Sequence, residues 1–325
     1  MTGKKNILSL IILLIICISL FSSEDSLTIK KTTPDSIRIE SDQNIKIDSL
    51  SVKVNSIQIN SLKTDSTLTD SAFIDSTAIR DSLELAKRKE IFKDAFEMTK
   101  TQNIFDVINY IIKKTKPLTA VNIFGDLQNA LYWKKKDINS AVVFGQTGVE
   151  FAEFNANKNE IFNPELTKKL KMEEVYISFD IASFCWDGWG EKNIEINPTL
   201  TFIGYQAARH HLKLVKELDL GDINLARSHW MLAGMYLSSK SYEKAIAHYN
   251  RSAYLAKRGG SHSETLLAKA FEIMSKRLIS DTPELENEYN FYLENLKKQD
   301  DGKFFAAEVE TAFKVYKNLI IRSKE

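Results

Sequence analysis

The chain has 325 residues, with 44 Lys and Arg against 43 Asp and Glu, and two cysteines. A formal net charge of +1 supplies no global field for nucleic acid, so nucleic acid is not an expected partner. Twelve glycines, two cysteines and 43% hydrophobic residues exclude collagen-like, disulfide-stapled and multi-span membrane proteins.

Residues 1–23 have the pattern of a signal peptide. Lys4 and Lys5 precede an apolar run over 7–21, and two small serines follow it. As a helix, this run spans roughly 22 Å of a roughly 30 Å hydrocarbon core, which favours cleavage over an uncleaved anchor. Lipid attachment at Cys17 is a third alternative, although this cysteine lies inside the apolar run. We expect an exported protein of the periplasm or cell envelope that contacts the membrane only through this segment.

Residues 24–82 form a biased tract in which an Asp-Ser step recurs from Asp25 to Asp81. Ser and Asp side chains compete for backbone hydrogen bonds and oppose helix continuation. The tract holds one aromatic residue, Phe73, which is too little bulk to offset chain entropy by burial. It predicts a disordered linker that holds the next domain away from a membrane or wall. Alternating apolar residues over 44–60 leave open a strand that pairs with a partner's sheet edge.

From 83 to 325 the apolar residues follow a helical period with few breakers, which predicts an all-α domain with a substantial core. Ser261 with Glu264 fits a capping box, and Thr282 before Pro283 fits another helix start. The expected helices run from about Leu83, from Ile104 to before Thr115, and over 118–135, 137–155, 165–187, 199–218, 222–239, 242–258, 262–280, 283–298 and 303–322.

The stretch 226–257 carries the clearest repeat pattern. Small Ala233 and Ala245 let two consecutive helices approach closely, while Tyr236 and Tyr249 fill the volume beside them. The run SHWMLAGMYLSSKSYEKAIAHYNRSAYLAK resembles a tetratricopeptide repeat.

A fainter copy lies upstream, where Tyr132, Ile138 and Ala141 keep the same spacing and Gly145 and Gly148 supply small residues. The resemblance implies an α-solenoid of helical hairpins across the helical domain, with at least about three units needed for stability. It also implies a concave surface, lined by the first helix of each pair, that receives peptide segments.

Carried over residue by residue, the resemblance places Arg227, Trp230, Leu237 and Ser238 in that groove. Arg227 would pair with a carboxylate and Trp230 would supply flat apolar area, the residue types that dominate many interfaces. In the alternative interpretation, Trp230 packs against a neighbouring repeat and Arg227 is solvated.

A second candidate site lies around Trp186, Asp187 and Trp189. Two tryptophans flanking an Asp-Gly turn can form a stacking platform for a sugar, with Asp187 and Glu191 accepting hydrogen bonds from its hydroxyls, and the carboxylates also suggest glycan cleavage. The alternative is that the tryptophans anchor a long loop to the helices.

The remaining chemistry-bearing residues favour structural roles. His210 and His211 are adjacent on a helix and point about 100° apart, so no metal site is expected. No cofactor motif is present in the sequence, and Cys185 between two aromatic residues is typical of a buried apolar position. The C-terminal helix either caps the stack or lies in the groove.

These observations predict an exported or membrane-tethered, non-catalytic protein–protein interaction module that binds a protein or peptide. A glycan-binding or glycan-cleaving envelope protein and a purely structural spacer are the alternatives.

Overall fold

The computed structural model describes residues 69–322. The predicted signal segment 1–23 and residues 24–68 of the predicted linker lie outside the described residues. The chain divides into two units, Met1–Ser76 and Thr77–Glu325, and the contacts and candidate sites described below belong to the second unit.

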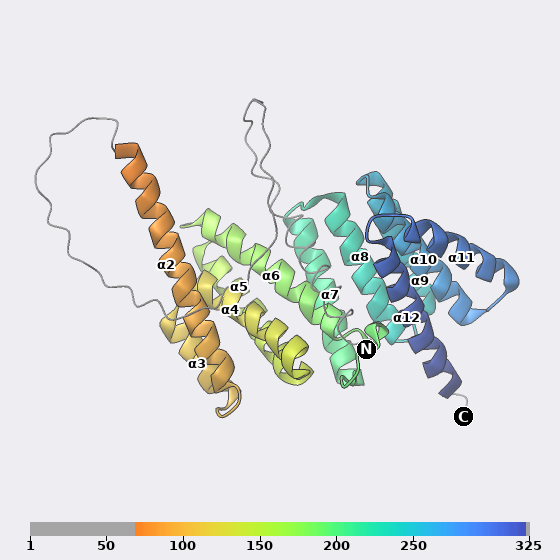
Figure 1. Ribbon diagram of the computed structural model, residues 1–325, viewed down its shortest axis with the longest axis horizontal. Helices are drawn as coiled ribbons and strands as arrows, with labels where there is room; N and C mark the ends of the chain where they lie inside the picture. The colour runs from red at the N-terminus through yellow and green to blue at the C-terminus, as the bar shows by residue number, and fades with distance from the viewer. Residues whose placement is uncertain (1–68, 323–325) are drawn as a thin grey trace, which may run out of the picture. The chain divides into compact units, whose positions relative to one another are not determined.

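The described residues form eleven α-helices and no strand, which confirms the predicted all-α class (Figure 1). Two short turns interrupt the series: the π-helical turn η1, Leu131–Lys135, and the 3-10 turn η2, Asp187–Trp189. The helices are α2 Thr69–Met98, α3 Ile104–Lys114, α4 Pro117–Ala130, α5 Ile138–Asn159, α6 Pro164–Phe184, α7 Pro198–Glu217, α8 Gly221–Ser238, α9 Tyr242–Arg258, α10 His262–Ile279, α11 Pro283–Lys297 and α12 Gly302–Arg322.

The predicted linker boundary at residue 82 differs from the structure, because α2 already begins at Thr69. Residues 69–82 contain three Asp-Ser steps, and each Ser or Asp in a helix costs only about 0.5 kcal/mol relative to Ala. Ala72, Phe73 and Ala78 lie between these steps, so the helical pattern extends farther upstream than the composition suggests.

Side-chain caps fix the helix starts. The predicted caps at Ser261 and Thr282 are confirmed, because each hydroxyl accepts the backbone N–H three residues on, at 3.4 Å. Glu264 does not complete the reciprocal box, since its carboxylate binds Arg227 instead. Four further starts are capped in the same way by Asn103, Asp137, Asn163 and Asn197.

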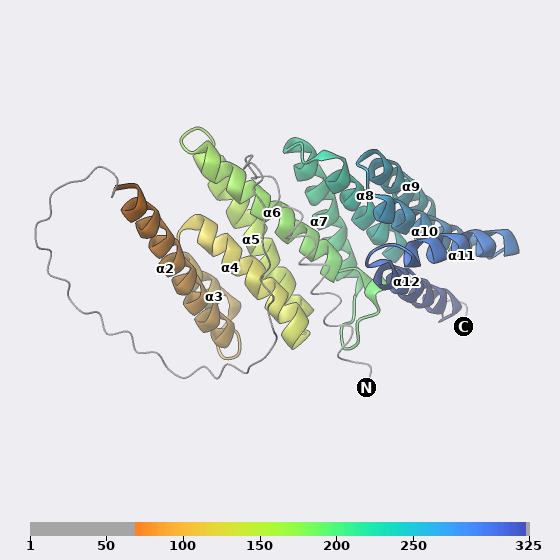
Figure 2. The same cartoon turned by 45° about the horizontal axis from the view of Figure 1, so that its top comes forward.

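Each helix from α3 to α12 packs on the next one along the chain, so that consecutive helices lie side by side (Figures 1 and 2). In addition, α4 packs on α6, α6 on α8, and α10 on α12. An ion pair from Arg227 to Glu264 and a ring contact from Trp230 to Phe271 connect α8 with α10. We call the surface shared by α4, α6, α8 and α10 the even-helix face.

Small residues allow the close helix contacts in the first half of the domain. A Cβ atom at Gly145 would lie 2.6 Å from Gln128 Oε1, and one at Gly148 would lie 2.9 Å from Ile177 Cδ1. These glycines therefore let α4 and α6 approach α5 closely, as expected for small residues on the second helix of a hairpin.

The core of the domain has two large clusters of buried side chains. The first is built from α2 to α7 and includes Phe124, Phe144 and Leu170. The second is built from α6 to α12, and Trp186 and Phe271 lie within it. Residues from α12 are thus an integral part of the second cluster.

Candidate functional site

Arg227 on α8 is held by a neighbouring helix. Its Nη2 and Nε atoms donate to Glu264 Oε1 of α10 at 2.7 and 3.1 Å. The two side chains are only 18% and 21% exposed, so water screens this pair less than a surface ion pair. Arg227 therefore serves the α8–α10 contact.

Trp230 is half-buried in an aromatic cluster. Its ring lies 5.4 Å from Trp186, 6.1 Å from Trp189 and 5.3 Å from Phe271, measured between ring centroids. The pairs with Trp186 and Phe271 are edge-to-face, and such pairs contribute about 0.5–1.5 kcal/mol each beyond the area they bury. Trp230 therefore packs against the segment that follows α6 and against α10.

Trp186 is 2% exposed and is the largest fully buried side chain of the described residues. Glycines on both sides make room for its indole: a Cβ atom at Gly188 would lie 2.3 Å from its Cζ2 atom, and one at Gly234 would lie 3.1 Å from its Nε1 atom. Trp189 is half-buried, and its indole N–H donates to the carbonyl of Ser183 at 2.8 Å. Trp186 thus presents no exposed face on which a sugar ring could stack.

Leu237 is fully buried and Ser238 is engaged within the chain. The Ser238 hydroxyl donates to Asp187 Oδ1 at 2.7 Å, and the Tyr316 hydroxyl of α12 donates to the same oxygen. Burial and the nearby carboxylate raise the pKa of Tyr316 well above its usual value, so this phenol remains a donor. This three-residue cluster joins η2, α8 and α12.

The C-terminal helix therefore lies over part of the even-helix face. It packs on α10, α11 and η2, and it reaches α8 through the bond between Tyr316 and Ser238. The sequence left open whether this helix caps the stack or lies in the groove. In the structure it is the last of the described helices, and it meets the end of α8 where Tyr316 contacts Ser238. All four predicted groove residues contact other parts of the same chain or are buried.

The even-helix face carries accessible polar side chains at α4 and α6. Asp126 pairs with Arg88 of α2 at 2.6 Å and keeps a side-chain exposure of 43%. Asp180 accepts a hydrogen bond from Asn129 at 2.9 Å. Desolvation by the surrounding helices raises the pKa of Asp126 and brings the pKa of Asp180 to about 6, although the Asn129 bond acts in the opposite direction.

These residues were missed by the sequence reasoning. Asp126 and Asn129 lie three positions apart on α4, so one face of the helix carries both. A polar stripe at helical spacing in an otherwise apolar helix was the available signal. The pairing of Asn129 with Asp180, 51 positions away, gave no local signal.

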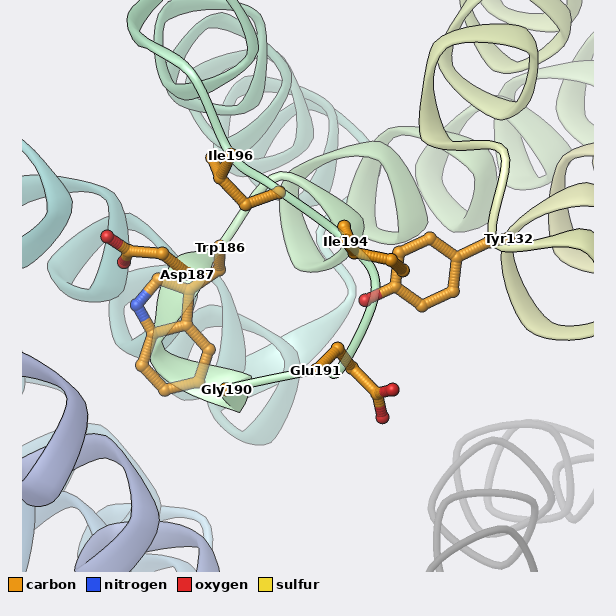
Figure 3. Close-up of a pocket in the computed structure, with 7 residues that line it drawn as sticks. All are labelled: Tyr132, Trp186, Asp187, Gly190, Glu191, Ile194 and Ile196. Carbon is orange, nitrogen blue, oxygen red and sulfur yellow. The ribbon is translucent and has the colours of Figure 1, made fainter.

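A small cavity lies where η1 meets the segment that follows η2. It has a volume of about 70 Å³, and Figure 3 shows Tyr132 reaching toward it from the side opposite Trp186. Lys136 bonds Glu191 at 2.8 Å beside it. A cavity of this size, lined by both polar and apolar groups, has room for ordered water molecules. Its lining residues are Tyr132, Trp186, Asp187, Gly190, Glu191, Ile194 and Ile196.

The histidines and Cys185 occupy structural positions. His210 contacts Glu174 at 2.5 Å, and His211 contacts the carbonyl of Val175 at 3.0 Å. Burial raises the pKa of Cys185 to about 12, so its thiol is protonated and unreactive at neutral pH. Across residues 82–321, no three His, Cys, Asp or Glu side chains gather as a metal site requires.

No protein-family model matches the chain, and no curated protein is significantly similar to it. The likeness to tetratricopeptide repeats therefore remains a resemblance carried by residues of this sequence. Among the helices that the structure describes, none is long and apolar enough to cross a bilayer.

Proposed function

We propose that the protein is an exported or membrane-tethered, non-catalytic interaction module with a tetratricopeptide-repeat-like helical domain, whose even-helix face binds a segment of a protein partner. In this arrangement α8 and α10 hold the chain's own η2 and α12, and α4 and α6 receive the partner segment. The N-terminal residues deliver and tether the domain in the cell envelope.

One observation carries the proposal: the even-helix face already binds helical and loop segments of its own chain. At α8 the bound segments supply an aromatic side chain, Trp186, and a tyrosine hydroxyl, Tyr316. These are the groups that proteins use to bind one another, because a large ring buries apolar area at little entropic cost.

At α4 and α6 the same face retains half-exposed polar groups. The carboxylates of Asp126 and Asp180 accept hydrogen bonds and would accept others from the backbone N–H groups or basic side chains of a peptide. A partner segment bound at α4 and α6 would add a further segment to η2 and α12, which the even-helix face already holds.

Site-specific photocrosslinking in the cell envelope tests the proposal. A photoreactive side chain replaces Asn122, which lies half-buried on α4 beside Glu173, and the matched control replaces Gln146, which is exposed on α5. We expect a protein adduct at position 122 that is absent at position 146. Equal labelling at both positions, or no adduct at 122, would contradict binding by this face.

The Arg227→Ala and Trp230→Ala variants are less suitable for this purpose. Both residues hold the domain together, so a lost partner would not be distinguished from a disturbed fold. The glycan-binding alternative would rest on Trp189 and Glu191, because Trp186 is buried.

A further inference from the structure

The turn between α5 and α6 exposes two adjacent large apolar side chains. Ile161 is 84% exposed and Phe162 is 87% exposed, the highest values among the large apolar residues whose burial the structure describes. Phe154, 65% exposed, lies near the same end of α5. Single exposed apolar residues are common, but an adjacent pair at the tip of a turn is typical of a contact surface.

The turn is firmly held, so the exposure of this pair does not reflect a loose segment. The Asn163 backbone N–H donates to the Asn159 carbonyl at 2.8 Å, and the Asn159 side chain donates to the Asn155 carbonyl at 2.7 Å. Just below, the buried Thr167 hydroxyl donates to the Ala156 carbonyl at 3.2 Å. Ile161 and Phe162 are therefore presented at little further cost in chain entropy.

The pair is flanked by positive charge. Residues 157–171 contain four lysines and two glutamates, and one of these glutamates, Glu165, is paired with Lys169 at 2.7 Å. The turn between α3 and α4 carries more lysines and lies at the same edge of the helices as the α5–α6 turn, as does the end of α2 nearest Thr77 (Figures 1 and 2). These further lysines are Lys113, Lys114 and Lys116, of which Lys116 pairs with Glu84 of α2 at 3.1 Å.

We propose that the α5–α6 turn inserts Ile161 and Phe162 into the surface of an anionic lipid bilayer. Apolar side chains at a protruding tip reach the acyl boundary, while lysines set behind them meet the lipid phosphates. This arrangement of an apolar tip and a cationic flank matches the order of hydrocarbon and phosphate in an anionic bilayer. The insertion is independent of partner binding at α4 and α6.

Depth-dependent fluorescence on the full chain tests this inference. An environment-sensitive dye is attached at Phe162→Cys in a Cys17→Ser background, where the remaining Cys185 is buried. The probe is a vesicle of equal parts phosphatidylglycerol and phosphatidylcholine. We expect blue-shifted emission that spin-labelled lipids quench, because the dye enters the acyl boundary. Unchanged emission at position 162 would overturn the proposal.

The matched control carries the dye at Phe202→Cys, a residue that is 60% exposed on α7. Its emission should not respond to vesicles even when the N-terminal segment holds the chain on the lipid. A shared response at both positions would show non-specific adsorption and would also overturn the proposal.

Two further measurements separate the apolar contribution to membrane insertion from the electrostatic contribution. Ile161→Asp should lower the quenching at position 162 about tenfold, since one apolar contact is lost and a charge is brought to the lipid. Vesicles of phosphatidylcholine alone should give a weaker signal. A signal that depends on protein concentration and not on lipid would identify a second copy as the occupant and overturn the proposal.

Discussion

Glu308 on α12 is a buried carboxyl group without a hydrogen-bond partner for its Oε1 atom, as far as the described residues show. It is 9% exposed, and burial raises its pKa to about 8 from an ordinary value of 4.5. The folded chain therefore holds a proton on Glu308 in a pH range in which the unfolded chain has lost it. Stability is greatest below pH 4.5 as far as this group is concerned, and it falls as the pH rises toward 8.

The Glu308→Gln substitution should remove this pH dependence. Between pH 5 and pH 9, the wild type should lose about 2–4 kcal/mol of unfolding free energy through Glu308, at roughly 1.4 kcal/mol per pH unit. Urea denaturation at the two pH values measures this loss. The unfolding free energy of the variant should fall by about 2–4 kcal/mol less than that of the wild type. The control Glu310→Gln changes a 51% exposed neighbour and should follow the wild type. Parallel curves for Glu308→Gln and wild type would contradict the assignment.

At the level of single residues, the sequence identified side chains that matter but not what they contact. Arg227 and Trp230 were expected on the surface that α8 presents, and both do interact there. Their partners, Glu264 and Trp186, are more than 35 positions away in the sequence. Helical periodicity predicts which side of a helix a residue occupies, but the neighbouring helix that meets this side depends on packing over long separations.

Gly204 of α7 marks the closest approach between helices in the middle of the domain. A Cβ atom there would lie 2.5 Å from Cys185 Cβ and 2.8 Å from Met235 Sδ. Both neighbours are fully buried, so neither can move aside without disturbing α6 or α8.

Gly204→Ala should lower the unfolding free energy by about 1–3 kcal/mol through overpacking. The matched control is Gly125→Ala on α4, where the nearest atom to the new Cβ is Ile177 Cγ1 at 3.3 Å. Alanine is favoured over glycine in a helix by up to about 1 kcal/mol, and this gain should offset the mild crowding. The unfolding free energy of the control should therefore stay near the wild-type value. Thermal denaturation compares the stability of the two variants. An equal loss of stability in both would argue against the tight contact of α7 with α6 and α8.

Helix boundaries were predicted within a few residues along most of the domain, because prolines, glycines and capping side chains mark them. Pro164, Pro198 and Pro283 each occupy the first position of a helix, where the missing N–H has no intrahelical partner to lose. The π-helical turn at Leu131–Lys135 was missed. The residue that ends it in the left-handed region, at a φ angle of 56°, is Lys136 and not a glycine, so the sequence does not mark this end. Such a change in hydrogen-bond register is set by tertiary packing.

Across the whole domain, the hydrogen bond from Tyr316 to Asp187 connects segments 129 positions apart and fixes α12 on the even-helix face. Tyr316→Phe should lower the unfolding free energy by about 1–3 kcal/mol, because the Asp187 carboxylate loses one of its two hydroxyl donors. Amide hydrogen exchange in α12 should quicken. The control Tyr254→Phe changes a 53% exposed ring on α9 and should alter neither measurement. Unchanged exchange in both variants would show that apolar packing alone seats α12.

The sequence predicted the order and class of the helices but not which surface they leave accessible. Apolar residues at helical spacing over 304–320 predict that α12 buries one side. A helix that caps the stack and a helix that lies in a groove both share this property. The choice depends on Asp187 and Ser238, two polar residues that no hydrophobic pattern highlights. The candidate site could therefore be located only in part.

The position of α12 also bears on how the chain matures. During synthesis α12 emerges after the helices on which it packs, yet its residues Ala306, Val309 and Ala312 complete the cluster that contains Trp186 and Phe271. Until these last turns dock, the tryptophan-rich interior lacks its closing layer. A nascent chain interrupted before residue 302 would therefore expose this apolar interior to chaperones and proteases.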